Sequence, residues 1–149
     1  MGHQHFTETQ YGVVAARRLA LDGLMWQVPS LSLAAQAFLL TVSLNVAIEP
    51  VSRLVAAIIG VVVTAASAQL MVKHRRHELI DRLLLEKMEA SLGLPKVHSS
   101  PAVLAAGLGM ARANWFVRIR SFAVWLAMLI LLGFVSAAAG AVAILNLIL

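Results

Sequence analysis

Three uncharged apolar runs dominate this sequence, and each is long enough to cross a lipid bilayer. They cover residues 29–48, 54–72 and 122–149. A membrane-spanning helix needs about 20 apolar residues, because the hydrocarbon core is about 30 Å thick and a helix rises about 1.5 Å per residue. The runs therefore predict an all-α integral membrane protein with three transmembrane helices. Pro29 suits the first turn of the first span, where its missing N–H is unimportant.

The composition excludes a free soluble enzyme. The chain of 149 residues is 60% hydrophobic and 13% charged, whereas ordinary globular domains are about 25% charged. A soluble domain of this size cannot hide that much apolar surface. The absence of cysteine excludes disulfides and thiolate sites. We find no glycine-rich phosphate loop, nucleophile elbow or zinc-protease motif, so we expect no enzymatic activity, no metal and no cofactor.

The basic residues predict the orientation of the spans. Eleven of the twelve Lys and Arg residues lie before the first span or between the second and third, and only Arg53 lies elsewhere. Basic residues collect on the cytoplasmic side of a membrane protein. We therefore expect the N-terminus and residues 73–121 in the cytoplasm and the C-terminus outside, in the plasma or bacterial inner membrane. The net charge of +5 then reflects orientation rather than nucleic-acid binding.

The same pattern divides the chain into four parts. Residues 1–28 form an N-terminal interfacial helix, opened by a capping box between Thr7 and Gln10. Residues 29–72 form a tight antiparallel hairpin, 73–121 a basic cytoplasmic segment, and 122–149 the third span.

Two helices are expected inside the cytoplasmic segment. No helix breaker separates span two from residues 77–92, so we expect one long helix that stops at Gly93. An amphipathic stripe on it must pack on a partner, and the stripe comprises Ile80, Leu83, Leu84, Met88 and Leu92. Ser100 and Pro101 begin a short apolar helix over 101–111, which is interfacial, re-entrant or packed on 77–92. Trp115 and Phe116 are expected in the interfacial belt before span three.

Span one carries the polar residues that first suggest a function. Polar groups at membrane depth usually face a bundle interior or a water path. In a homo-oligomer they would line a pore, and the residues in question are Ser32, Gln36, Ser43, Asn45 and Glu49. The alternative is that Gln36 and the serines form hydrogen bonds between helices, and that Glu49 pairs with Arg53.

Small residues at helical spacing predict close helix packing. Stripes of this kind let two helix backbones approach each other. The stripes comprise Ala56, Gly60, Thr64 and Ala68 in span two, and Gly133 and Ala137 in span three. The pattern does not say whether the neighbouring helix belongs to the same chain or to another copy. Since three helices enclose no pore alone, a channel would require a homo-oligomeric bundle.

A basic and histidine-rich set flanks the spans on the cytoplasmic side. We expect these side chains to contact anionic lipid headgroups or to take part in gating. The set comprises Arg17, Arg18, Lys73, His74, Arg75, Arg76 and His77.

Two functions follow from these patterns. The first is a small homo-oligomeric ion channel or pore, with span one lining the pathway. The alternative is a non-conducting membrane scaffold or partner subunit that binds another protein through helix 77–92. The layout, a tight two-span hairpin followed by a helix, resembles small bacterial membrane effectors of the SLATT type, and this resemblance of layout implies pore formation.

Overall fold

The computed structural model describes residues 6–110 and 120–149, and every regular element in this part of the chain is a helix. The helices are α1 (Glu8–Leu44), α2 (Pro50–Leu92), α3 (Pro101–Gly107) and α5 (Ser121–Ile148). Three of them, α1, α2 and α5, are long and apolar enough to cross a membrane. The predicted all-α fold with three membrane-spanning helices is confirmed to this extent. The expected aromatic belt of Trp115 and Phe116 lies outside the described residues.

Helix α1 runs without interruption through the N-terminal helix and span one. The capping box is confirmed: the Gln10 N–H donates to Thr7 Oγ1 at 3.2 Å, and the Thr7 N–H donates to Gln10 Oε1 at 3.1 Å. The expectation that Pro29 begins a helix is wrong, because Pro29 lies inside α1. A proline removes one intrahelical N–H and crowds the preceding turn. The long runs of helical residues on both sides of Pro29 hold the chain helical there in spite of this cost.

Helix α2 continues span two far beyond the apolar run, as predicted, and ends at Leu92. Gly93 follows with φ of +68°, a conformation that costs glycine little. The Leu94 N–H then bonds back to the Glu89 carbonyl at 2.9 Å and closes the helix end. Ser100 caps α3 by accepting the Val103 N–H, with Pro101 in the first turn, which confirms the predicted start of this helix.

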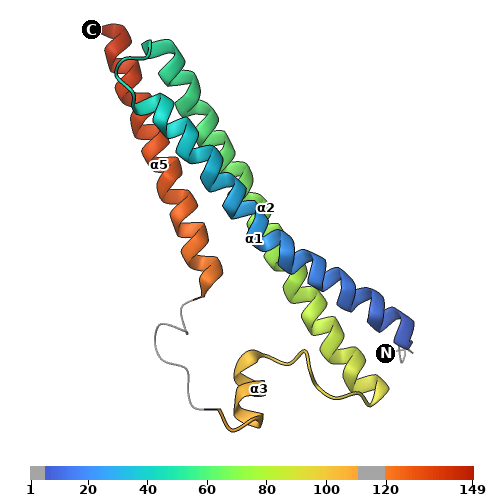
Figure 1. The fold of residues 1–149 in the computed structure, drawn as a ribbon. Coiled ribbons are helices and arrows are strands. Elements are labelled where there is room, and N and C mark those ends of the chain that lie inside the picture. Colours follow the sequence, from blue (N-terminus) through green and yellow to red (C-terminus); the bar gives the residue numbers. More distant parts are fainter. Residues whose placement is uncertain (1–5, 111–119) are drawn as a thin grey trace. The chain divides into compact units, whose positions relative to one another are not determined.

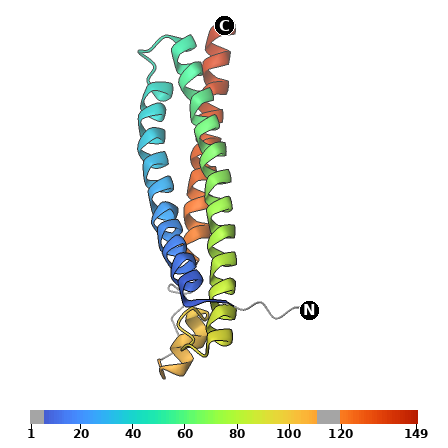
Figure 2. The same ribbon diagram turned by 90° about the vertical axis from the view of Figure 1, so that its right-hand side faces the viewer.

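The chain folds as two units, and α1 and α2 contribute to both. The membrane unit comprises Trp26–Val72 and Ile119–Leu149, and the polar unit comprises Met1–Met25 and Lys73–Arg118. In the membrane unit, α1, α2 and α5 run side by side (Figures 1 and 2). Small and medium apolar side chains form its core, including Ala56, Ala57, Leu129, Ala139 and Ala143.

The polar unit has a small apolar core and an unusually polar helix interface. Leu85 and Met88 are its buried apolar residues on α2. In the stripe predicted on 77–92, Met88 is buried within the chain, whereas Ile80 and Leu83 are 49% and 51% exposed, so a partner that covers them stays a prediction. The buried face of α2 is centred instead on acidic residues, because these meet arginines and a tyrosine on α1.

Candidate functional site

The membrane unit contains a polar cluster centred on Gln36. Its side chain is fully buried. The amide Nε2 donates to the Gly60 carbonyl and to Thr64 Oγ1, both at 2.6 Å. The amide Oε1 accepts from Ser136 Oγ at 3.2 Å. One amide of α1 therefore bonds to both α2 and α5 of the same chain.

The two serines that share this face of α1 are also buried and bonded. Ser32 Oγ lies 2.6 Å from Ser67 Oγ on α2 and donates to the Val28 carbonyl at 2.7 Å. Ser43 Oγ donates to the Leu40 carbonyl at 3.3 Å. The structure thus brings Ser32, Gln36 and Ser43 to one buried helix interface.

Asn45 and Glu49 do not join this cluster. Both are exposed in the turn after α1, where Asn45 Oδ1 accepts the Ala47 N–H at 3.0 Å. Among the described residues Glu49 forms no ion pair with Arg53. The buried Arg53 instead donates from Nε to the Ser43 carbonyl at 3.0 Å. A carbonyl in the last turn of a helix lacks an intrahelical partner and carries partial negative charge, so Arg53 acts as a cap for α1.

The small-residue stripes of α2 and α5 pack against each other within one chain. A Cβ added at Gly133 would lie 2.7 Å from Thr64 Cγ2, and one added at Gly60 would lie 2.7 Å from Ser136 Oγ. Both distances are too short for real atoms, so glycine is required at this separation of the helix backbones. Ala56 is buried, Ala68 half-buried and Ala137 exposed. Ala137 therefore does not contribute to this packing.

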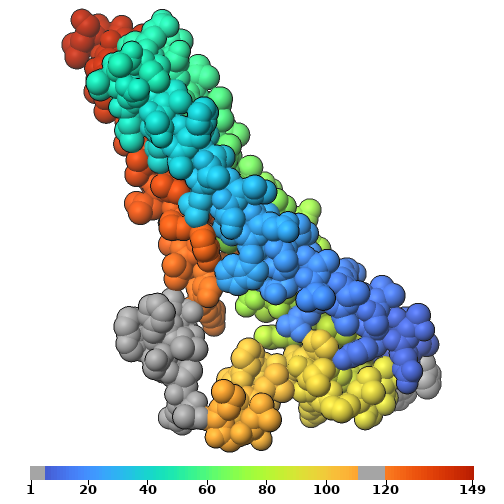
Figure 3. Space-filling view, in the orientation of Figure 1, coloured from blue at the N-terminus to red at the C-terminus, as the bar shows by residue number. Residues whose placement is uncertain are grey.

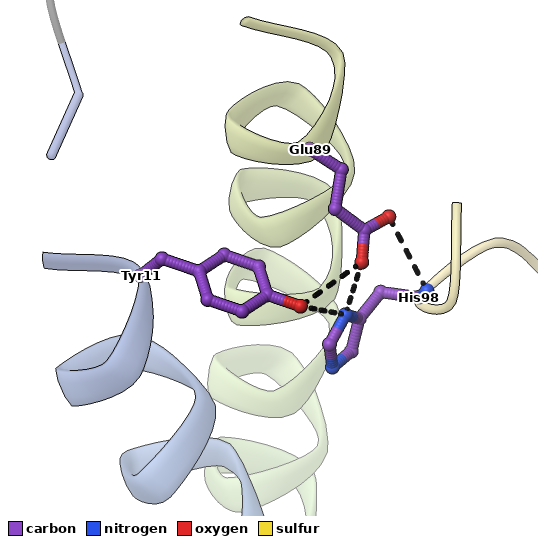
Figure 4. Close-up of polar contacts among 3 residues, drawn as sticks. All are labelled: Tyr11, Glu89 and His98. Atoms are coloured by element: carbon purple, nitrogen blue, oxygen red, sulfur yellow. Dashed lines mark hydrogen bonds and ion pairs between the residues drawn. The ribbon is translucent and has the colours of Figure 1, made fainter. Parts of the chain in front are cut away.

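A second cluster, in the polar unit, joins Tyr11, Glu89 and His98 (Figure 4). The carboxylate of Glu89 is fully buried. It accepts from the Tyr11 hydroxyl at 3.2 Å, from His98 Nδ1 at 2.6 Å and from the His98 backbone N–H at 3.4 Å. The rings of Tyr11 and His98 meet edge to face, with centroids 5.8 Å apart. The carboxylate therefore ties α1 and the segment after α2 to one point.

These contacts shift two pKa values. Burial alone would raise the pKa of Glu89, but hydrogen bonds and charge from His98 and the bond from Tyr11 outweigh it and hold the pKa below its ordinary 4.5. Burial, followed by the hydrogen bond and negative charge of Glu89, raises the pKa of Tyr11 above its ordinary 10.0. Both shifts favour an ionised Glu89 and a protonated Tyr11 at neutral pH.

The other acidic residues on the buried face of α2 bind arginines. Arg17 forms a bidentate pair with Asp81, and this hydrogen bond raises the pKa of Arg17. Glu78 accepts from Arg18 at 3.3 Å and from Arg75 at 2.5 Å. The pairings run antiparallel along α1 and α2, and they place the negative charges of α2 against α1.

The seven predicted headgroup or gating residues therefore separate into two groups. Arg17, Arg18 and Arg75 are bonded to carboxylates. Lys73, Arg76 and His77 are exposed, while His74 is half-buried. His74 Nδ1 is buried without a hydrogen-bond partner among the described residues.

Sequence reasoning did not predict the Tyr11–Glu89–His98 cluster. In the sequence, 78 residues separate Tyr11 from Glu89. No spacing signal exists for residues that meet only through tertiary structure. Comparison of the chain with family models, with curated proteins and with solved structures gives no significant match.

Proposed function

We propose that this protein is a non-conducting membrane subunit: the membrane unit anchors it, and the polar unit binds another protein. The observation that carries the proposal is the burial of Gln36. Its amide is bonded to α2 and α5 of its own chain, and Ser32 and Ser43 are buried on the same face. Polar groups that bond between helices are not free to replace the hydration shell of an ion.

The exposed cations support an orientation with the polar unit in the cytoplasm. Lys73 and Arg76 follow span two directly and are exposed. Side chains at this position reach anionic headgroups, and each contributes about 1 kcal/mol near such a surface. In this proposal they anchor the cytoplasmic end of α2, whereas Arg17, Arg18 and Arg75 stabilise the polar unit itself.

The partner-binding surface in this proposal is the exposed face of α2. Ile80, Leu83 and Lys87 are exposed at helical positions i, i+3 and i+7, which share one face. The acidic residues Glu78 and Asp81 are buried against α1, so the exposed face combines apolar and positive side chains. Its chemistry fits an acidic amphipathic helix, which would cover the apolar pair and meet the cations.

A flux measurement tests the non-conducting role. Purified protein in liposomes is expected to carry no ion current over a range of ions, voltages and pH values, with Gln36→Leu indistinguishable from the parent chain. The homo-oligomeric channel expected from span one stays a prediction that the same assay decides. A current that Gln36→Leu alters would overturn the proposal and support the channel.

Site-specific photocrosslinking in membranes tests the binding role. A photoreactive residue at Leu83 is expected to give one dominant protein adduct, whereas the same residue at the buried Leu85 gives none. Lys87→Glu should abolish the adduct, and Lys96→Glu, an exposed lysine elsewhere on the polar unit, should leave it. Adducts only with lipid, or only with another copy of this chain, would refute an acidic protein partner.

A further inference from the structure

The segment 101–110, which contains α3, is uncharged, and its side chains are exposed except for the half-buried Leu104 and Ala105. Val103, Leu108 and Met110 are 61%, 77% and 65% exposed. The orange atoms of this segment are uncovered on the face that Figure 3 shows. A helix that is apolar on all sides is normally buried in protein or lipid. Of the three alternatives for this helix, packing on the stripe of residues 77–92 is the one that these exposed side chains do not favour.

Most backbone groups at the ends of α3 are hydrogen-bonded within the segment, which lowers the cost of placing it in an apolar medium. Pro101 has no N–H, and the Val103 N–H bonds to the side chain of Ser100. At the other end, the N–H groups of Leu108 and Met110 bond to the carbonyls of Leu104 and Ala105 at 3.0 and 2.9 Å. Unsatisfied helix ends are the main cost of moving a short helix into an apolar medium, and this segment leaves few of them.

The length of the chain also limits how far the segment can lie from the start of α5. Helix α5, which is long and apolar enough to cross a membrane, begins at Ser121. Since an extended chain spans at most about 3.6 Å per residue, Met110 lies within about 40 Å of that point whatever the path between them. Lys96 and Arg120, exposed on either side of the segment, complement anionic headgroups.

We propose that residues 101–110 lie in the headgroup and acyl-chain boundary of the bilayer that holds the long helices. The segment is too short to span the membrane. Lipid covers all of its sides at once, which a protein groove would not do for a helix of 7 residues. The inference rests on the membrane location of the long helices and not on the proposed protein partner, so it can succeed or fail independently of that partner.

The absence of cysteine makes a direct test possible. Single cysteines are introduced as Leu108→Cys and, as a matched exposed control, Lys87→Cys, and each is labelled with an environment-sensitive fluorophore. The full-length protein is placed in vesicles of zwitterionic lipid, so that insertion does not depend on anionic headgroups. We expect blue-shifted emission at Leu108, quenching by a nitroxide near the top of the acyl chain, and protection from aqueous iodide. The Lys87 probe should show the opposite behaviour.

Three outcomes would overturn the proposal. Equal iodide quenching at both positions would place the segment in water. Protection from both iodide and nitroxide lipid would mean that protein covers it, and loss of that protection on diluting the protein in lipid would identify a second copy. Stronger quenching by a nitroxide at the end of the acyl chain would indicate a deep re-entrant position. If Leu108→Cys does not fold, Val103→Cys replaces it, and the same results are expected for a probe at that position.

Discussion

Replacing Gln36 by leucine removes an amide of α1 that bonds to both other long helices of the membrane unit. The side chain makes three contacts, with Gly60, Thr64 and Ser136. Hydrogen bonds between membrane helices contribute about 0.6 kcal/mol on average and about 1.7 kcal/mol at most, so three of them predict a loss of about 2 kcal/mol. The hydroxyls left behind can bond to carbonyls of their own helices, which holds the loss near the average rather than the maximum.

The measurement is the free energy of unfolding of the purified protein in mixed micelles, followed by the fluorescence of its three tryptophans. A loss of about 2 kcal/mol is roughly a 30-fold decrease in the folding equilibrium constant. The matched control is Thr41→Val on the same helix, because the exposed Thr41 hydroxyl bonds to the Ala37 carbonyl of its own helix at 2.8 Å. The control should change stability by less than about 0.5 kcal/mol.

Equal stability of Gln36→Leu and Thr41→Val would refute the reasoning, since the amide would then add nothing between helices. A stabilised Gln36→Leu would refute it more strongly. The stability readout is also independent of ion flux, so the role of Gln36 in packing and its role in a pore are measured separately.

Two further predictions concern packing and pH. Gly133→Ala should destabilise the membrane unit by about 1–3 kcal/mol, because the new methyl group meets Thr64. The control Gly23→Ala has open space around it and should be neutral or stabilising by up to about 1 kcal/mol. Equal shifts in the thermal unfolding of the two variants would contradict this packing. Since the pKa of Glu89 is lowered on folding, its contribution to stability is present above the ordinary 4.5 and is lost as the pH falls below that value. Hydrogen exchange of the amides around His98, corrected for intrinsic rates, should therefore rise below pH 4.5. Glu89→Gln should expose the same amides to exchange at neutral pH. Protection of these amides that does not depend on pH would refute the role of the carboxylate.

The sequence alone determined that three helices are long and apolar enough to cross a membrane, and it located several of the helix ends. Length and apolarity are properties of each run by itself, so they predict three candidate spans irrespective of how the helices pack. Local chemistry likewise predicted the cap at Thr7, the stop at Gly93 and the cap at Ser100, since these depend on neighbours within a few residues. Pro29 was misplaced because the helix on both sides of it outweighs its local preference.

Only the tertiary structure decided which side chains meet. From spacing, Gln36 fitted either a pore or a helix interface, and the fold places it between α1, α2 and α5 of one chain. The same holds for Glu89, which belongs to a charged helix in sequence and is buried against Tyr11 and His98 in the fold. A helical pattern specifies the face on which a residue lies, whereas the partner on that face depends on contacts between residues far apart in the chain.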